Sequence, residues 1–202
     1  MYFVKTPWYL KSVYPSLIWD IKKQTTLYLT FDDGPIPMVT EEILKILKDY
    51  NARATFFVIG DNVFKHKSIY EKILMNEHII GNHTMHHTNG WKTENELYYR
   101  DVQLCEDIIQ SKIFRPPYGR IGYNQIQHLK KDFSIYMWDV LSGDFDTNID
   151  VEQCTKNVIE HATDGSIIVF HDSEKAKDRV LKSLPKVLEY FSRKGYSFES
   201  IN

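Results

Sequence analysis

The sequence predicts an α/β protein built on a parallel sheet with crossover helices, and three observations support this fold class. Short apolar runs rich in β-branched and aromatic residues alternate with segments whose apolar residues recur at helical spacing. No linker, repeat or low-complexity stretch interrupts this alternation along the 202 residues. Polar residues gather directly after several apolar runs, where parallel α/β proteins place their sites. An open doubly wound sheet and a closed βα barrel both fit this pattern.

The apolar runs predict seven strands. They are Thr26–Phe31, Thr55–Ile59, His78–Asn82, Lys112–Arg115, Ser134–Trp138, Ser166–Phe170 and Tyr196–Glu199. Helical periods lie between them, for example from Ile43 to Tyr50 and from Val180 to Phe191. The last of these contains Pro185, which we expect to kink the helix or to break it in two.

Size and composition narrow the class of protein. At about 150 residues per domain, residues 1–202 form a single domain, with residues 1–24 as an N-terminal extension packed on it. The 25 Lys+Arg nearly balance the 27 Asp+Glu, so the charge offers no case for binding nucleic acid or an acidic membrane. Aromatic residues make up 14% of the chain, which fits either a ring-rich core or a groove that stacks on sugars.

The first 19 residues contain no segment that would enter a membrane. Lys5, Pro7, Lys11 and Pro15 interrupt every apolar run, whereas a signal peptide needs about 7–15 unbroken apolar residues and a membrane span about 18. We therefore expect a cytoplasmic protein without stable membrane insertion, and leave export by another route open. Nothing in the sequence indicates an oligomeric state.

The two cysteines, Cys105 and Cys154, lie far apart and form no CxxC pair. This spacing excludes a Cys-based zinc site or a thioredoxin-type motif. We expect two buried thiols, with a disulfide as the alternative.

Two adjacent carboxylates, Asp32 and Asp33, follow the first predicted strand. Neighbouring side chains on an extended backbone point to opposite sides, so one can face a metal while the other faces a substrate or an internal partner. The alternative is that one of them only caps the turn at Gly34-Pro35.

His83 and His87 are four residues apart, so a helical turn would place both rings on one face. Two imidazoles in this arrangement can bind one ion, whereas His86 would point roughly 100° away. Polar loop histidines are the alternative. With a carboxylate two strands away, a His₂Asp site is the better interpretation, and its open coordination positions indicate catalysis.

Arg115 and His171 also follow predicted strands. Arg115 precedes Pro116 and Pro117, and a guanidinium on such a rigid loop is placed to hold a carboxylate. The alternative is an arginine that extends to solvent. His171 ends an apolar strand, and its titration near neutrality suits a general acid, with a hydrogen-bonded core histidine as the alternative.

Together these residues resemble the polysaccharide deacetylases, also called NodB-homology domains or family 4 carbohydrate esterases. Four motifs carry the resemblance, in the family's order and spacing between Thr30 and about Ser173. They are Thr30-Phe31-Asp32-Asp33-Gly34-Pro35, His83-Thr84-Met85-His86-His87, Arg115-Pro116-Pro117-Tyr118-Gly119 and Val169-Phe170-His171-Asp172. The resemblance implies a distorted (β/α) barrel of the NodB-homology type, with seven or eight parallel strands.

The resemblance also implies roles for individual residues. The metal triad would be Asp33, His83 and His87, binding zinc, with cobalt or nickel as alternatives. The catalytic base would be Asp32, oriented by Arg115, and the catalytic acid would be His171. The backbone N–H of Tyr118 would serve the oxyanion. The predicted substrate-binding residues are Tyr118, Pro116, Phe145, Val169 and Trp91.

One motif departs from the family. Its usual form is Asp-x-x-Asp-Trp, whereas this chain reads Leu141-Ser142-Gly143-Asp144-Phe145. Leu141 thus stands where the resemblance places the carboxylate that partners the catalytic histidine, and Phe145 stands in place of Trp. We expect His171 to titrate lower, with reduced activity, unless Asp139 or Asp144 takes over that role.

The resemblance implies a metal-dependent hydrolase that removes N-acetyl groups from N-acetylglucosamine-containing polysaccharides or oligosaccharides and releases acetate. Its partner would be a glycan. One alternative is a hydrolase of another small amide or imide on the same scaffold. The other is a weakly active or inactive glycan-binding member, because Leu141 replaces an acidic residue.

Overall fold

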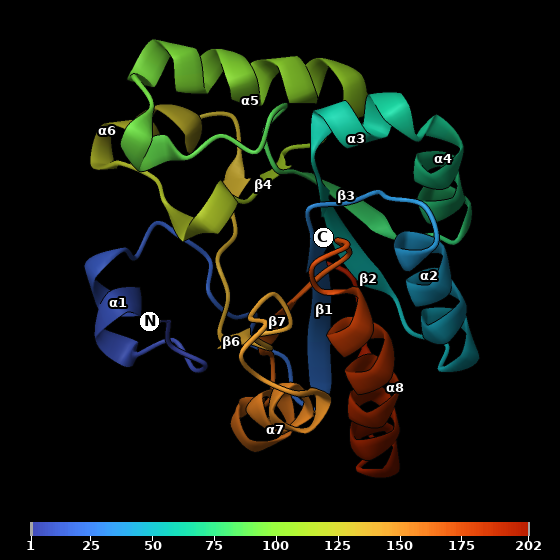
Figure 1. Cartoon of the computed structure of the whole chain (residues 1–202). Coiled ribbons are helices and arrows are strands. Elements are labelled where there is room, and N and C mark those ends of the chain that lie inside the picture. The colour runs from blue at the N-terminus through green and yellow to red at the C-terminus, as the bar shows by residue number, and fades with distance from the viewer. Residues whose placement is uncertain (1, 202) are drawn as a thin grey trace.

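The computed structural model describes residues 2–201 and shows a curled sheet with helices packed around it (Figure 1). Its strands are β1 (Thr26–Asp32), β2 (Ala54–Val58), β3 (Ile79–Asn82), β4 (Ile113–Phe114), β5 (Ser134–Ile135), β6 (Val140–Leu141), β7 (Ile167–His171) and β8 (Ser197–Phe198). They run in the order β5-β4-β3-β2-β1-β7-β6, and β8 pairs with the start of β1. Every strand pair is parallel, as predicted.

All seven predicted strands are present, with shifted ends, but β6 was not predicted. It consists only of Val140 and Leu141, and two residues are too few to show a β-type alternation in the sequence. β6 pairs with β7 and opposes Leu141 to Val169, so it extends the sheet beyond β7.

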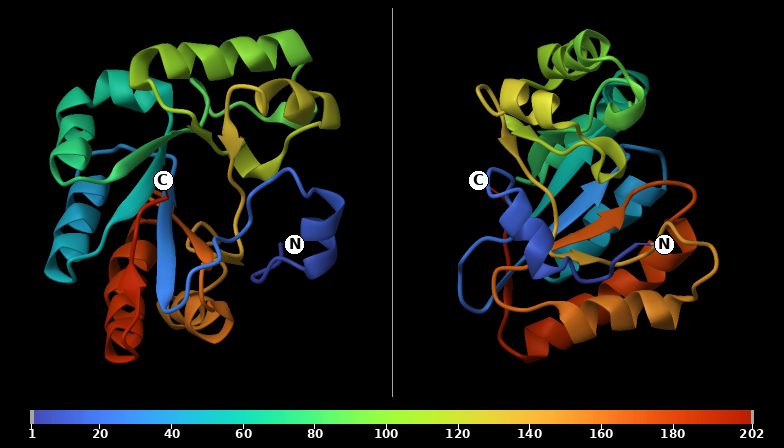
Figure 2. Two further views of the ribbon diagram at one scale, coloured as in Figure 1. Left: turned by 180° about the vertical axis from the view of Figure 1, so that it is seen from behind. Right: turned by 90° about the vertical axis from the view of Figure 1, so that its left-hand side faces the viewer.

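Helices cover the outer face of the sheet (Figures 1 and 2). They are α2 (Val39–Asp49), α3 (Gly60–Lys65), α4 (Lys67–Met75), α5 (Asn95–Ile109), α6 (Tyr123–Leu129), α7 (Val151–His161) and α8 (Lys177–Arg193). A further helix, α1 (Trp8–Val13), belongs to the N-terminal segment and buries none of its residues. Short 3₁₀ turns occupy Gly90–Lys92 and Pro117–Gly119. α8 continues through Pro185, so the predicted break does not occur. No helix among the described residues has the length and apolar character that crossing a bilayer requires.

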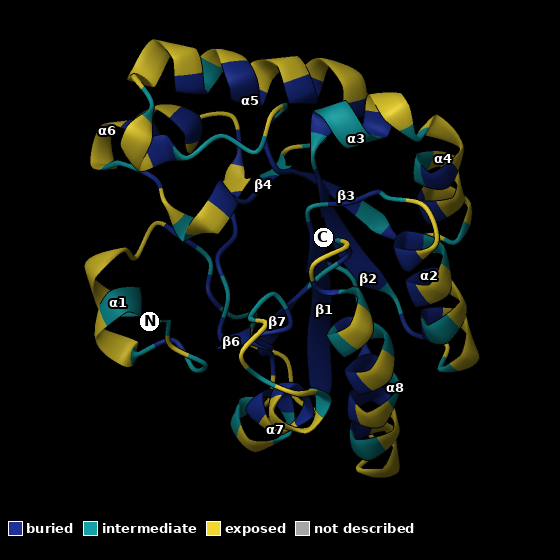
Figure 3. Cartoon of the chain, in the orientation of Figure 1, coloured by how far each residue is buried: buried dark blue, intermediate teal, exposed yellow. Residues whose placement is uncertain are grey.

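Successive side chains of β1 point alternately into the buried core and toward the polar residues on the other side of the sheet. Phe31 stacks between Phe56 and Phe170, at ring-centroid distances of 5.0 and 6.0 Å, in the core beneath the helices. Because successive side chains alternate, Thr30 and Asp32 face the opposite, inner side of the sheet. Much of the aromatic content therefore builds the buried core, which Figure 3 shows in dark blue along the central strands.

The segment before β1 lies between the two edges of the curled sheet. Ile18 exchanges backbone hydrogen bonds with Ile135 and Met137, at 2.9 and 2.7 Å, and Ile21 donates to the carbonyl of Gly165 at 2.9 Å. This segment thus connects the β5 side of the sheet to the start of β7. Its inward residues, Leu17 among them, are buried.

A buried carboxylate anchors the same segment. Asp139 lies 2.5 Å from the Lys5 ammonium and 2.8 Å from the Lys11 ammonium, and it accepts a hydrogen bond from Ser166. Burial by itself would raise the pKa of Asp139, but these donors lower it below its usual range. Asp139 therefore binds the N-terminal segment through Lys5 and Lys11. The two cysteines, Cys105 and Cys154, are free and buried, as expected.

Candidate active site

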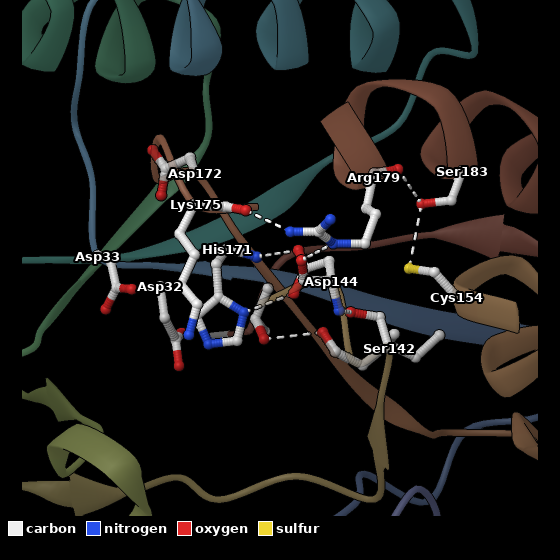
Figure 4. A network of polar contacts seen from close by, with 12 residues as sticks. Asp32, Asp33, Ser142, Asp144, Cys154, His171, Asp172, Lys175, Arg179 and Ser183 are labelled. Atoms are coloured by element: carbon white, nitrogen blue, oxygen red, sulfur yellow. Dashed lines mark hydrogen bonds and ion pairs between the residues drawn. The ribbon is translucent and has the colours of Figure 1, made fainter. Parts of the chain in front are cut away.

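The predicted polar residues meet at the carboxyl end of the central strands. Asp32 ends β1, Asp33 follows it, and His171 ends β7, which pairs with β1 (Figure 4). His83 follows β3, and Arg115 follows β4. Since β4, β3, β2, β1 and β7 are consecutive in the sheet, residues from distant parts of the sequence share one edge.

Asp33, His83 and His87 form a compact cluster of donor atoms, all within 4.8 Å of one another. The Oδ1 atom of Asp33 lies 3.1 Å from Nε2 of His87 and 3.7 Å from Nε2 of His83. The Nδ1–H of His83 donates to the backbone carbonyl of Arg115 at 2.8 Å, which leaves Nε2 as the free donor atom facing Asp33.

The electrostatics of this cluster suit a cation. Burial lowers the pKa of His83 to about 4, so its imidazole is neutral at pH 7. Burial would raise the pKa of Asp33, but the hydrogen bond from His87 and the nearby histidines lower it far below its usual range. A carboxylate and neutral imidazoles are the forms that bind metals. The three side chains therefore fit a divalent ion such as zinc, and their role as ligands stays a prediction.

The loop that carries the two histidines is not the helical turn that we considered. Residues 83–87 bend instead, with positive φ angles of 65° at Thr84 and 57° at His87. Asn82 accepts a hydrogen bond from the Thr84 N–H, and Thr84 accepts one from the Thr88 N–H. These local bonds, rather than helical geometry, bring the two imidazole rings to a centroid distance of 5.2 Å.

Asp101 on α5 holds the same loop from behind. Its carboxylate accepts hydrogen bonds from the ring and the backbone N–H of His86 and from the hydroxyl of Thr88. His86 therefore points to Asp101 and lies outside the metal-type cluster, as its position in the sequence indicated. Sequence reasoning had not singled out Asp101.

Asp32 and Arg115 form a buried ion pair beside the cluster. The Nη1 atom of Arg115 lies 2.7 Å from Oδ1 of Asp32 and also donates to the Thr30 hydroxyl. The guanidinium further donates to the Met137 carbonyl and lies 4.0 Å from the ring centroid of Phe57. Arg115 is fully buried, so the alternative of a solvent-exposed arginine is wrong. The arrangement fixes the orientation of the Asp32 carboxylate.

His171 has a carboxylate partner, which decides between the two outcomes that the sequence left open. Asp144 accepts hydrogen bonds from Nδ1–H and from the backbone N–H of His171, both at 2.7 Å. Burial would lower the pKa of His171, but Asp144 raises it to about 9. The lower titration was expected only if neither Asp139 nor Asp144 replaced the missing carboxylate, and Asp144 replaces it. Of the two substitutes considered, Asp144 takes the role that Leu141 cannot, while Asp139 serves the N-terminal segment.

Asp172 holds the loop that follows Asp33. Its carboxylate accepts hydrogen bonds from the Gly34 N–H at 3.0 Å and from the Thr40 hydroxyl at 2.6 Å. Burial raises the pKa of Asp172 to about 8. The sequence motif contained this residue, but sequence reasoning gave it no role. Its position directly after His171 was the available signal.

The predicted substrate-binding residues fall into two groups. Tyr118 is 58% exposed with its ring 4.5 Å from that of His87, and its backbone N–H has no acceptor among the described residues. Phe145 meets His171 edge-on at 5.2 Å, and Val169 lies two residues before His171 and so on the same side of β7.

The other two predicted residues lie differently. Pro116 is buried at the base of the turn that presents Tyr118. Trp91 is exposed and hydrogen-bonds the Ile121 carbonyl, with the Arg120 guanidinium 5.5 Å from its ring. Among residues 2–201 it has no recorded contact with the Asp-His cluster.

The fold and the site together define a class of protein. A parallel curled sheet presents two histidines and a carboxylate at its carboxyl edge, with an Asp–Arg pair and a His–Asp pair beside them. This combination is typical of hydrolases that use a metal together with an acid and a base.

Comparisons with known proteins identify the family. A family model described as polysaccharide deacetylase matches residues 20–132, more than half of the chain. A peptidoglycan-N-acetylglucosamine deacetylase of Bacillus cereus is 33% identical over 181 residues, which cover 86% of this chain and 66% of the relative. A second Bacillus cereus protein with that name is 29% identical, covering 91% and 90%. The chain belongs to the polysaccharide deacetylase family.

A solved structure confirms the fold. The crystal structure of the Bc1960 peptidoglycan N-acetylglucosamine deacetylase, in complex with a naphthalenyl-N-oxidanyl-benzamide, superimposes with a TM-score of 0.89. The two chains are 30% identical over 97% of this chain and 95% of that one. The predicted NodB-homology type of distorted barrel is therefore confirmed.

Proposed function

We propose that this protein is a metal-dependent de-N-acetylase that removes acetyl groups from N-acetylglucosamine residues of peptidoglycan. One observation carries the proposal: the Asp33-His83-His87 cluster lies beside an Arg-held carboxylate, Asp32, and a carboxylate-held imidazole, His171. The names of the relatives support peptidoglycan as the substrate. Because the proposed base, acid and metal ligands are all present, a deacetylase is favoured over an inactive glycan-binding member of the family.

Asp33, His83 and His87 would hold the metal, with zinc as the first choice. A bound divalent ion would polarise the amide carbonyl and lower the pKa of a bound water. The donor set of two imidazoles and one carboxylate leaves positions open for both.

Asp32 is the proposed base. Its carboxylate is 3% exposed and held by Arg115, so it accepts a proton from the attacking water without having to reorient. Among residues 2–201 the Tyr118 N–H has no acceptor, so it is available to donate to the oxyanion of the tetrahedral intermediate.

His171 is the proposed acid. Because Asp144 raises its pKa to about 9, the ring is an imidazolium at pH 7 and carries the proton that the leaving amine needs. With Nδ1–H committed to Asp144, Nε2–H is the proton that is transferred. The products are acetate and a free amino sugar.

Acetate release tests the proposal. The protein is incubated with peptidoglycan glycan strands and with N-acetylglucosamine oligomers, after chelation and after addition of zinc or cobalt. We expect acetate from both glycans and only with added metal. If zinc binds stoichiometrically but no glycan releases acetate, the proposal is wrong, and hydrolysis of small amides by the same samples would favour the alternative hydrolase.

A further inference from the structure

A pocket of about 460 Å³ opens beside the acid end of the site. It is lined by Tyr2, Phe145, Asp146, Thr147, Asn148 and Lys175. Phe145 is shared with the site, because its ring meets His171 edge-on at 5.2 Å. The pocket therefore adjoins the proposed acid, His171.

Lys175 gives this pocket a free positive charge. It lies in the loop after β7, is exposed, and places its ammonium 6.0 Å from the centroid of the Phe145 ring. Figure 4 draws it together with the polar network around His171. Across residues 2–201, no carboxylate lies within ion-pair distance of it.

The only acidic residue of the pocket is engaged elsewhere. Asp146 accepts hydrogen bonds from the backbone and side-chain amides of Asn148, at 3.0 and 2.9 Å, and from the Tyr2 hydroxyl at 3.2 Å. Burial and Asp146 raise the pKa of Tyr2 to about 12, so Tyr2 remains a donor. Asp146 thus orders the pocket wall. After the Asn148 hydrogen bonds, the nearby charge of Lys175 helps to lower the pKa of Asp146, but the two form no ion pair, so the Lys175 ammonium keeps its donors for a ligand.

The remaining lining suits a sugar ring. Tyr2 and Phe145 lie 5.1 Å apart at 58°, forming an aromatic corner of the kind that packs against the apolar face of a sugar. Thr147 adds a hydroxyl, and Asn148 adds an amide oxygen, as partners for sugar hydroxyls. Rings, polar groups and one unpaired cation together match an anionic sugar.

We propose that this pocket binds a carboxylate-bearing sugar adjacent to the N-acetylglucosamine that is deacetylated, with Lys175 contacting the carboxylate. The inference rests on the proposed function and adds a specificity determinant to it. In glycan strands of peptidoglycan each N-acetylglucosamine is flanked by N-acetylmuramic acid, and where the stem peptide has been removed its lactyl group carries such a carboxylate. Lys175 would then distinguish peptide-free strands of peptidoglycan from neutral polymers of N-acetylglucosamine.

Three oligosaccharides of equal length test this inference with the metal-loaded protein. The first alternates N-acetylglucosamine with N-acetylmuramic acid and has free lactyl carboxylates, the second has the same carboxylates converted to amides, and the third contains only N-acetylglucosamine. We expect kcat/KM to be highest on the first. Lys175→Gln should reduce the preference for the first over the second about 3- to 10-fold, and higher salt should reduce it in the wild type.

A second lysine provides the control. Lys186 is exposed on α8 and does not line the pocket, so Lys186→Gln should keep both the preference and the rates. If Lys175→Gln lowers kcat/KM equally on carboxylate and amide oligomers, or leaves the preference intact, the inference is wrong while the proposed function stands. A preference that appears only when stem peptides are attached would also overturn it. If the wild type releases acetate from none of the three, the proposed function fails first.

Discussion

The Asp144 carboxylate accepts two hydrogen bonds from His171, one from the ring Nδ1–H and one from the backbone N–H, both at 2.7 Å. The two bonds fix the ring relative to the end of β7 and direct Nε2 away from Asp144. Asp144 is fully buried, so its charge acts on the imidazolium through little intervening solvent. Arg179 in turn donates to the Asp144 backbone carbonyl at 2.6 Å and holds that loop in place.

Replacing Asp144 should move the alkaline limb of the pH–rate profile. With a His171 pKa of about 9, the wild-type imidazolium persists across neutrality and activity falls as the pH rises through about 9. In Asp144→Asn the favourable charge is lost while burial still opposes protonation, so the limb should shift to or below the ordinary value of 6.5. The measurement is kcat/KM from pH 5 to about pH 10 with metal-loaded protein.

Leu141→Asp tests whether His171 still needs a carboxylate at position 141, where the family's usual motif has one. If Asp144 already supplies the charge, adding a carboxylate at the 5% exposed Leu141 position should destabilise the fold without raising activity. A large gain in kcat from Leu141→Asp, or an unchanged alkaline limb in Asp144→Asn, would contradict the role of Asp144.

Metal binding should depend on the three clustered residues and can be measured without substrate. His87→Ala removes one of the Nε2 donors, so we expect the zinc Kd to rise by at least about 100-fold, because even residues that only support a ligand cost 10–100-fold. Isothermal titration calorimetry of the chelated protein gives the affinity.

His86→Ala is the matched control for that experiment. His86 lies one residue from His87 but hydrogen-bonds Asp101, so its loss should leave zinc stoichiometry intact. Asp32→Asn should also bind zinc while losing turnover, provided that circular dichroism shows it folded. Wild-type zinc affinity in His87→Ala would exclude that residue as a ligand.

The main site residues were predictable because each ends a strand or directly follows one. Parallel strands end at one edge, so Asp32, His83, Arg115 and His171 had to converge once the strand order placed β4, β3, β1 and β7 close together. The sequence also indicated that His86 is less well placed as a ligand than His83 and His87.

Side-chain direction in loops was not predictable. The bend at residues 83–87 depends on positive φ angles at Thr84 and His87, which sequence spacing does not show. The partner of His171 was ambiguous for the same reason, since only the path of the chain after β6 brings Asp144 rather than Asp139 to the ring. Lys175 went unnoticed because a surface lysine has no distinctive sequence signal.

Arg115 should contribute strongly to stability as well as to catalysis. It is fully buried and makes hydrogen bonds to Asp32, Thr30 and Met137, so Arg115→Met leaves the Asp32 charge buried without a partner. Breaking a buried pair in this way costs about 3–5 kcal/mol in the free energy of unfolding. Urea denaturation followed by tryptophan fluorescence measures the change.

An exposed arginine calibrates that result. Arg53 pairs with Glu77 on the surface, with side chains that are 41% and 74% exposed, so Arg53→Met should cost no more than about 1 kcal/mol. If Arg115→Met were as mild as Arg53→Met, the ion pair with Asp32 would not be intact in solution.

Gly34 should tolerate no side chain, because Asp172 lies where its Cβ would be. A Cβ at Gly34 would lie 1.8 Å from Oδ2 of Asp172, and that carboxylate is fixed by the Gly34 N–H and by Thr40. Gly34→Ala must therefore displace the loop that carries Asp33, at a cost of about 1–3 kcal/mol in stability and with weaker zinc binding. Gly122→Ala is the control, since its nearest neighbour, Gln125, would be at an ordinary 3.5 Å. Urea midpoints and zinc affinities of the two variants decide the matter, and equal values for both would show that Asp172 does not constrain the Asp33 loop.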